Sequence, residues 1–315
     1  MKHNRFVRTS SALVCAVVLA GCGESGNSSE EKPLSEEEAL AVPDQLSVKN
    51  PAVVASSDIP AFPIEKYLPK VGEDARVAAA SGELIRACMA RFGFQYQPPV
   101  ASQETLDSEE NGANRIRRYG VSSASSAASY GYHLPRSSVD GLQSPEAPPM
   151  SDAENQVFIG DQDPVSGVKP GDKVAGKEIP AGGCSGEAQR RLKIEPRQRM
   201  AEKINNVSFA RSQENSQVKE AFQEWSTCMA RAGHSYKTPL EPLDNLTGKS
   251  PSPVEISAAK EDVKCKDSVN LVGVWFAVES KIQEELIARN EEVLTQDSKS
   301  FDALVRRASQ ELAKS

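Results

Sequence analysis

Cysteine and histidine are the residue types in this chain whose spacing could support chemistry, and both are scarce. The chain of 315 residues contains six cysteines and three histidines. Cys184 lies in the sequence Gly-Cys-Ser-Gly, directly before a segment that we expect to be helical, and His234 follows 50 residues later. A helix N-terminus lowers the pKa of a thiol, and a histidine can then serve as the base for a cysteine nucleophile. Cys184 and His234 therefore provide the one catalytic hypothesis that the sequence supports, a cysteine hydrolase.

The segment around Cys184 resembles in part the Asp-Cys-Ser-Gly motif of cell-wall cysteine peptidases, which have a histidine downstream. Gly183 stands in place of the aspartate, and residues 187–193 (EAQRRLK) are charged where that family packs apolar side chains. His234 is expected to end a helix, whereas the family places its histidine on a strand. The sequence also lacks a Walker loop, a GxSxG motif and an HExxH motif. We therefore predict no catalytic residue, metal site or cofactor, and keep a cell-wall hydrolase as the alternative function.

The N-terminus indicates a different use of cysteine. Three basic side chains precede residues 12–20 (ALVCAVVLA), an apolar run too short to span a bilayer and typical of a secretory leader. The run ends in Leu19-Ala20-Gly21-Cys22, which resembles the lipobox of bacterial lipoproteins. The resemblance implies removal of residues 1–21, a diacylglycerol thioether on Cys22, and anchoring on the outer, extracytoplasmic face of the cell membrane. An ordinary cleaved leader with a chance cysteine is the alternative interpretation.

Charge and hydropathy exclude two broad classes of protein. The net charge is −7, and removal of a leader with three basic residues changes it to −10. An acidic chain lacks the basic surface that releases phosphate counterions, so we expect no nucleic-acid partner. A mean hydropathy of −0.47, with no second long apolar run, excludes a multi-span membrane protein. The predicted partners are the membrane, through Cys22, and an envelope protein or glycan.

Composition and periodicity divide the remaining chain into a tether and a helical body. Residues 22–63 are rich in Ser, Glu, Pro and Gly, which predicts a disordered acidic tether. Residues 64–313 form the predicted helical domain, in which apolar side chains recur at three- and four-residue spacing. No alternating strand pattern competes with these helices, so the predicted fold class is mainly α. Helices are expected over about 73–92, 186–212 with a break near Pro196, 213–232 and 301–313, and another follows Cys265 with its apolar stripe over 271–286. Short helices are expected near 122–130 and 153–159.

An internal repeat organises the helical domain. Residues 88–99 (CMARFGFQYQPP) and 228–239 (CMARAGHSYKTP) are identical at seven of twelve positions, which favours duplication of a helical unit. The predicted half-repeats span about 64–196 and 197–313, and a loop-rich insertion occupies about 100–183 of the first half.

The repeat also predicts a disulfide pattern. With Cys15 in the leader and Cys22 on lipid, four cysteines remain, and an even number in an exported domain indicates disulfides. Each repeated cysteine precedes one later cysteine, which favours the pairs Cys88–Cys184 and Cys228–Cys265. Crossed pairing between the halves and a four-cysteine zinc site are the alternatives.

The body also resembles actinobacterial lipoproteins. The resemblance rests on the lipobox, the acidic tether, the entry segment Pro63-Ile-Glu-Lys-Tyr67, the repeated Cys-Met-x-x-x-Gly-x-x-Tyr motif and a late Trp275-Phe-x-Val-Glu279 helix, over residues 62–296. It implies no known activity. We predict a lipid-anchored, non-catalytic binding or interaction module of the cell envelope.

Two weaker patterns suggest ligand sites. Residues 161–167 (DQDPVSG) are a poor match to a calcium loop, and we interpret them as a solvated turn. Five aromatic side chains could form a glycan platform, although aromatic residues of this kind more often cover a small core; they are Phe94, Tyr96, Tyr119, Tyr130 and Tyr132.

Overall fold

The structure of the protein is a computed structural model. It describes residues 35–43, 46–98, 112–134, 149–244, 246 and 250–314. Residues from Glu36 to the C-terminus form one compact unit, and the fold described below is that of this unit. The predicted leader and Cys22 lie outside the described residues.

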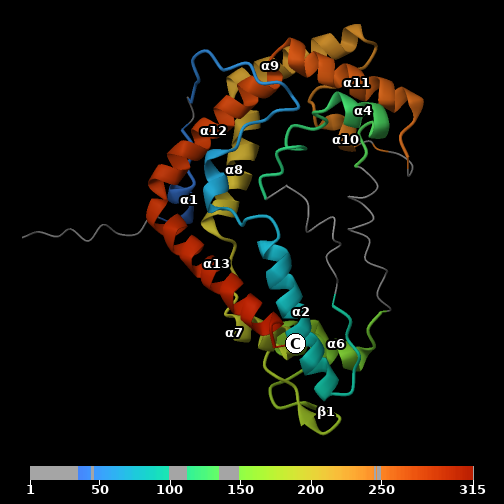
Figure 1. Ribbon diagram of the computed structural model, residues 1–315, viewed down its shortest axis with the longest axis vertical. Helices are drawn as coiled ribbons and strands as arrows, with labels where there is room; N and C mark the ends of the chain where they lie inside the picture. Colours follow the sequence, from blue (N-terminus) through green and yellow to red (C-terminus); the bar gives the residue numbers. More distant parts are fainter. Residues whose placement is uncertain are drawn as a thin grey trace, which may run out of the picture. The chain divides into compact units, whose positions relative to one another are not determined.

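The unit is mainly helical, as predicted from the sequence (Figure 1). One short antiparallel hairpin pairs Lys173 with Glu178. The α-helices are α1 (Glu36–Ala39), α2 (Glu73–Arg91), α4 (Ala124–Tyr130), α6 (Asp152–Ile159), α7 (Gly183–Leu192), α8 (Met200–Glu214), α9 (Ser216–Arg231), α10 (Glu241–Asp244), α11 (Pro253–Ser268), α12 (Leu271–Arg289) and α13 (Glu291–Leu312); the 3-10 helices are η1 (Pro63–Tyr67), η2 (Gly160–Gln162) and η3 (Pro164–Ser166); the strands are β1 (Lys173–Val174) and β2 (Lys177–Glu178).

Most of the predicted helices are present, and the elements that differ include α11, the hairpin and the start of α13. The predicted break near Pro196 is confirmed, because α7 ends at Leu192 and α8 begins at Met200. Helix α11 and the hairpin are additional to the prediction. Helix α13 begins at Glu291, ten residues earlier than predicted.

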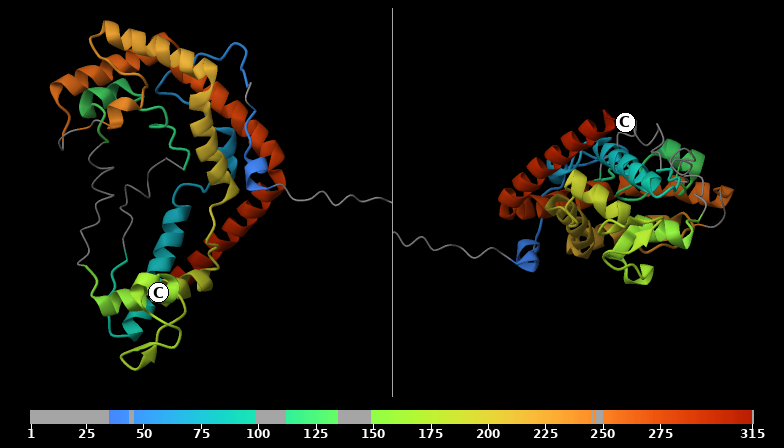
Figure 2. Two further views of the ribbon diagram at one scale, coloured as in Figure 1. Left: turned by 180° about the vertical axis from the view of Figure 1, so that it is seen from behind. Right: turned by 90° about the horizontal axis from the view of Figure 1, so that it is seen from below.

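Two groups of helices bury the larger apolar clusters. In the first, α8, α9 and α12 surround Trp225 and Trp275, whose side chains are fully buried. In the second, α2, α6 and α7 enclose a smaller cluster around the buried Cys88 and Cys184. Helix α13 packs against α2 and α7, and the two helices α2 and α13 lie side by side in Figures 1 and 2. The C-terminal helix of the second half-repeat therefore packs on the first half.

The repeated motif forms the same helix ending twice. Gly93 and Gly233 have φ of +85° and +87°, the left-handed conformation that glycine adopts most easily. In each copy the residue after this glycine donates its N–H to the carbonyl of the motif methionine, at 3.2 Å for Met89 and 2.9 Å for Met229. This Schellman ending places the motif cysteine one turn before the end of α2 and of α9.

Both predicted disulfides are confirmed. Cys88 pairs with Cys184, and Cys228 pairs with Cys265, with Cα–Cα distances of 5.6 and 5.7 Å. The partner cysteines differ in position, because Cys184 lies in the first turn of α7 and Cys265 in the last turn of α11. The structural repeat therefore covers the motif helices α2 and α9 and their endings. It does not extend to the partner helices α7 and α11, which present their cysteines from opposite ends.

The predicted disordered tether over 22–63 is wrong from Glu36 onward. Helix α1 is held at its end by Asn290, whose side-chain Nδ2 donates to the Ala39 carbonyl at 2.8 Å. Residues 46–62, which we call the N-terminal strap, bury Leu46, Ile59 and Phe62 in the first apolar cluster.

Side chains of the body also satisfy the polar backbone of the N-terminal strap. Gln217 accepts the Val48 N–H at 2.8 Å and donates to its carbonyl at 3.0 Å. Asp267 accepts both the N–H and the hydroxyl of Ser56, at 2.9 and 2.5 Å. Such pairing stabilises an extended segment that has no sheet partner.

The insertion packs on α11, α2 and α7. Residues 112–134, with α4, lie against α11, and α6 packs on α2 and α7. Tyr119 and Tyr132 are only 1% and 2% exposed, so they belong to the interior. Tyr96 packs on Phe158 with ring centroids 5.5 Å apart. The hypothesis of a shared aromatic glycan platform is therefore wrong.

Candidate binding pocket

The structure does not bring Cys184 and His234 together. Cys184 is buried between α2, α6 and α7, and its sulfur is bonded to Cys88. His234 follows α9 and stacks on Tyr236, which packs against the other apolar cluster. The geometry therefore gives no support to the predicted nucleophile and base.

The remaining described histidine, His133, and the turn at 161–167 have structural partners. His133 lies 3.3 Å from a carboxylate oxygen of Glu255. In the predicted turn at 161–167, Asp161 accepts the Gly182 N–H at 2.5 Å. Among the described residues, no three His, Cys, Asp or Glu side chains are grouped so that they could hold a metal ion.

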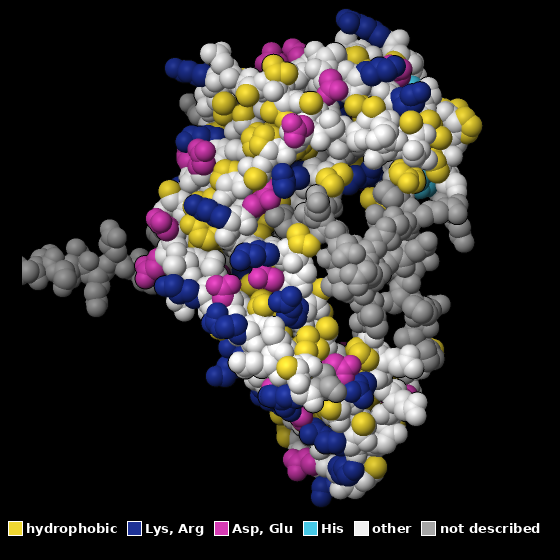
Figure 3. Space-filling model, viewed as in Figure 1, with side chains coloured by type: hydrophobic (Ala, Val, Ile, Leu, Met, Phe, Trp, Pro, Cys, Tyr) yellow, Lys and Arg dark blue, Asp and Glu magenta, His cyan; other side chains and the backbone are white. Residues whose placement is uncertain are grey.

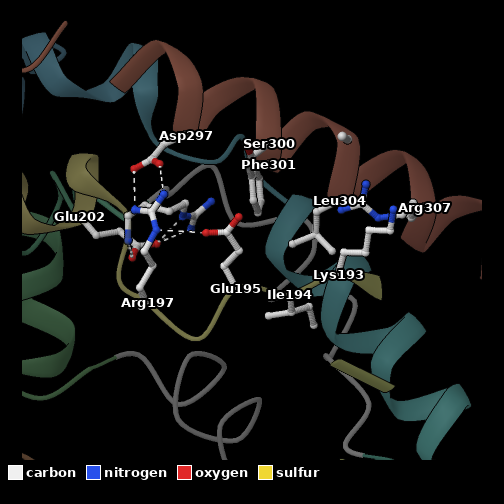
Figure 4. Close-up of a pocket in the computed structure, with 12 residues that line it drawn as sticks. Lys193, Ile194, Glu195, Arg197, Glu202, Asp297, Ser300, Phe301, Leu304 and Arg307 are labelled. Atoms are coloured by element: carbon white, nitrogen blue, oxygen red, sulfur yellow. Dashed lines mark hydrogen bonds and ion pairs between the residues drawn. The ribbon is translucent and has the colours of Figure 1, made fainter. Parts of the chain in front are cut away.

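A pocket of about 420 Å³ lies where the connection between α7 and α8 passes α13 (Figure 4). This volume is within the range of small-molecule sites. Residues 193–199, which we call the α7–α8 loop, contribute one wall, and α13 contributes the other. The lining side chains are Lys193, Ile194, Glu195, Arg197, Arg199, Glu202, Asp297, Ser300, Phe301, Ala303, Leu304 and Arg307.

Lys193 begins the α7–α8 loop in a conformation that usually belongs to glycine. Its φ is +56°, and the Lys193 and Ile194 N–H groups donate to Arg190 and Gln189 at 3.1 and 2.9 Å. This is the same Schellman ending that α2 and α9 make with Gly93 and Gly233. A side chain in the left-handed region costs about 1–2 kcal/mol relative to glycine. Lysine therefore occupies a strained position at the mouth of the pocket.

One end of the pocket holds arginines that are already paired with carboxylates. Arg197 donates to Asp297 at 2.5 Å and to Glu195 at 3.1 Å. Arg199 donates to Glu202 at 2.8 Å through Nε, and its guanidinium carbon lies 4.0 Å from the Phe301 ring centroid. Figure 4 shows Arg197, Glu195 and Asp297 gathered at this end. The Arg197–Asp297 ion pair and the contact of Arg199 with the Phe301 ring join the loop to α13.

Asp297 is the central carboxylate of that end. Its side chain is 5% exposed, and it accepts the Met200 N–H at 2.9 Å as well as the Arg197 bond. Burial opposes ionisation, but the hydrogen bonds from Arg197 and from the Met200 N–H outweigh it and hold the pKa of Asp297 below its usual value. Because Met200 opens α8, Asp297 also caps the N-terminus of that helix from a distant segment.

Because the pKa of Asp297 is lowered, we expect the free energy of unfolding to decrease at acidic pH. A carboxyl whose pKa is lower in the folded state stabilises it above the unfolded pKa, about 3.9, and this contribution is lost as the pH falls through the folded pKa. Asp297→Asn should therefore reduce the free energy of unfolding at pH 7 and reduce its loss between pH 5 and pH 2. Urea unfolding over this range measures both. Asp302→Asn, an exposed position on α13, is the matched control; equal acid sensitivity of wild type and Asp297→Asn would contradict the assignment.

The opposite end of the pocket carries two cations without a carboxylate. Arg307 uses Nε to donate to the Leu192 carbonyl at 2.7 Å, and Lys193 is exposed. Within the part of the chain that the structure describes, neither makes an ion pair. Ile194, Phe301 and Leu304 are half-buried and lie between the two ends, as Figure 4 shows. The pocket thus combines an apolar floor, a neutralised end and a cationic end.

Sequence reasoning missed this pocket. Its walls come from segments about 100 residues apart, and no motif joins them. Comparisons with protein families, curated proteins and solved structures found no match to the chain. No described helix has the length and apolar character needed to cross a bilayer.

Proposed function

We propose that the chain is a lipid-anchored, non-catalytic binding protein on the outer face of the cell membrane, with the pocket beside α13 as its ligand site. The pocket is the observation that carries the binding role, because its two walls are joined by the Arg197–Asp297 ion pair and its cationic end makes no ion pair within the described chain. The Leu19-Ala20-Gly21-Cys22 motif supports the location. The engagement of Cys184 in a disulfide gives no support to the alternative hydrolase.

In this proposal the body is held close to the membrane. The 14 residues from Cys22 to Ser35 can span at most about 50 Å, even when fully extended. From Glu36 onward the chain is fixed to the body, where Arg289 donates to the Ala41 carbonyl at 2.6 Å and to the Glu38 carbonyl at 3.1 Å. A chain tethered through all of 22–63 would reach considerably further. The contacts of α1 therefore favour a ligand that is available near the membrane surface.

The surface itself offers no comparable feature on the face shown in Figure 3. Basic and acidic side chains are mixed over this face, without a large area of either sign. Mixed charge of this kind is typical of a solvated protein surface. This distribution favours the pocket over an extended charged surface as the recognition site.

We expect Cys22→Ala to abolish lipid attachment. The experiment is metabolic labelling with radioactive palmitate in a bacterial host that processes lipoproteins, followed by separation of membrane and soluble fractions. Wild type should be labelled and sediment with membranes. Cys15→Ala, which changes the other leader cysteine, is the matched control and should keep the label. Labelling is the decisive readout, because an unprocessed leader can itself retain a protein at the membrane. Persistent label on Cys22→Ala would contradict the anchor.

A further inference from the structure

We propose that the pocket binds a small monoanion with an apolar body, and that Lys193 and Arg307 hold its anionic group. The inference rests on the proposed binding function and adds the chemical class of the ligand. It depends on three observations, which are the charge balance of the lining, the apolar floor and the strained backbone of Lys193.

The charge balance indicates one negative charge on the ligand. The lining contains four basic and three acidic side chains, and the acidic ones all lie beside Arg197 or Arg199. Those two arginines are therefore compensated, and the surplus positive charge is at Lys193 and Arg307. Arg307 is half-buried, and a half-buried cation without a partner is unfavourable, so a bound anion would remove that cost. Lys193 is exposed, and it would add a charge-assisted hydrogen bond to the same anion.

The geometry of Arg307 leaves room for an oxyanion. Its Nε–H is used by the Leu192 carbonyl at the end of α7, at 2.7 Å. The C-terminus of a helix is its negative end, and this contact explains why an arginine lies there. Its two terminal nitrogens have no hydrogen-bond partner among the described residues, and Figure 4 places them at the same end of the pocket as the Lys193 side chain. A guanidinium with both terminal nitrogens unpaired suits a carboxylate or a phosphate oxygen.

The apolar side chains between the two ends of the pocket indicate the chemistry of the rest of the ligand. Ile194 and Leu304 lie between the cationic end and the paired end, and Phe301 lies beside Arg199. These half-buried side chains would contact an uncharged, apolar group. A purely inorganic anion would use the cationic end alone and leave the floor exposed to water, so we expect it to bind more weakly.

The presence of lysine at position 193 is not explained by the structure of the helix ending alone. The two other Schellman endings of this type, on α2 and α9, have glycine at the left-handed position. Glycine at 193 would make the same hydrogen bonds without strain, so the ending of α7 does not require lysine. The strained backbone at Lys193 therefore indicates that the lysine side chain has a functional role. Lys193→Gly therefore separates the two roles, because it should improve the fold and weaken binding.

The test uses the full chain with both disulfides formed, and isothermal titration with 4-phenylbutyrate, its neutral amide 4-phenylbutanamide and inorganic phosphate. We expect 4-phenylbutyrate to bind at least tenfold more tightly than its amide, because the amide lacks the charge. Inorganic phosphate should bind more weakly than 4-phenylbutyrate, because it lacks the apolar group.

Lys193→Gly should weaken 4-phenylbutyrate binding about tenfold and raise Tm by about 2 °C. Lys299→Gln, on α13 outside the pocket lining, is the matched control and should change neither quantity. Arg307→Gln should also weaken binding, but with a lower Tm because the Leu192 contact is lost.

Equal binding of acid and amide, no binding of any probe, or unchanged affinity in Lys193→Gly would overturn the inference. These results are independent of palmitate labelling at Cys22, so failure of the ligand class and failure of the anchor are distinguishable.

Discussion

Arg118→Met should lower the free energy of unfolding by about 3–5 kcal/mol, because it leaves a fully buried carboxylate without its cation. Glu279 on α12 is 0% exposed and accepts Nε of Arg118 at 3.0 Å. Arg118 also donates to the carbonyls of Ala113 and Asn205, at 2.9 and 2.8 Å, so its loss leaves several buried acceptors unpaired. A cost of this size is a large share of the stability of an ordinary domain.

A double variant isolates the cause of this effect. Adding Glu279→Gln removes the buried charge and keeps an acceptor for the Tyr119 hydroxyl, which donates to Glu279 at 2.8 Å. We expect the double variant to be less destabilised than the sum of the two single variants, as measured by urea unfolding. Arg86→Met is the matched control, because its ion pair with Glu83 is open to solvent, and we expect its loss to change the free energy of unfolding little. A cost for Arg118→Met no greater than that of the control would show that the buried pair does not hold the insertion to α12.

A second buried ion pair explains where sequence periodicity failed to predict a helix. Helix α9 was predictable because its inner face is apolar, with Phe222, Trp225 and Met229 at helical spacing. The inner face of α11 instead carries Asp262 and Lys266, both 0% exposed and 3.1 Å apart. An apolar stripe is therefore absent from the sequence of α11, although the charges satisfy one another and Trp225 inside the fold.

Helix α13 and the N-terminal strap show two further limits. The buried Asp297 interrupts the apolar stripe of α13, so the pattern predicts only the helix after Phe301. The strap has the composition of a disordered segment, but side chains far along the chain, Gln217 and Asp267, pair with its backbone. The composition of a segment indicates how much apolar surface that segment can bury by itself. It does not report hydrogen-bonding side chains that lie about 170 to 210 residues away, as they do here.

The disulfides were predictable and the pocket was not, for the same reason. The repeat is a local pattern of residue types, and it was sufficient to pair the cysteines within each half. The pocket depends on where α13 meets the α7–α8 loop, and no local pattern specifies that contact. The one signal in the sequence is a lysine at the position where the repeated helices have glycine, and it becomes readable only after the end of α7 is known.

Removing the Cys88–Cys184 disulfide by a double change to alanine should destabilise the protein by about 4–5 kcal/mol, on the loop-entropy estimate for a 96-residue separation. The same change at Cys228 and Cys265, which are 37 residues apart, should cost about 4 kcal/mol. Each variant keeps the other disulfide and is therefore its matched control in thermal and urea unfolding. The smaller loop should give the smaller effect, and the reverse order would show that native contacts around the disulfides matter more than unfolded-state entropy.

Exposure predicts a different order for chemical reduction under native conditions. Cys88 and Cys184 are 2% and 0% exposed, whereas Cys228 is only half-buried on α9. A reducing thiolate must reach a sulfur atom, so we expect Cys228–Cys265 to be reduced first and Cys88–Cys184 to resist until the packing of α2 on α7 opens. Alkylation and peptide mass analysis at timed intervals measure the order. Faster reduction of Cys88–Cys184 would mean that α7 separates from α2 without global unfolding, and in that case the α7–α8 loop that begins at Lys193 would move with it.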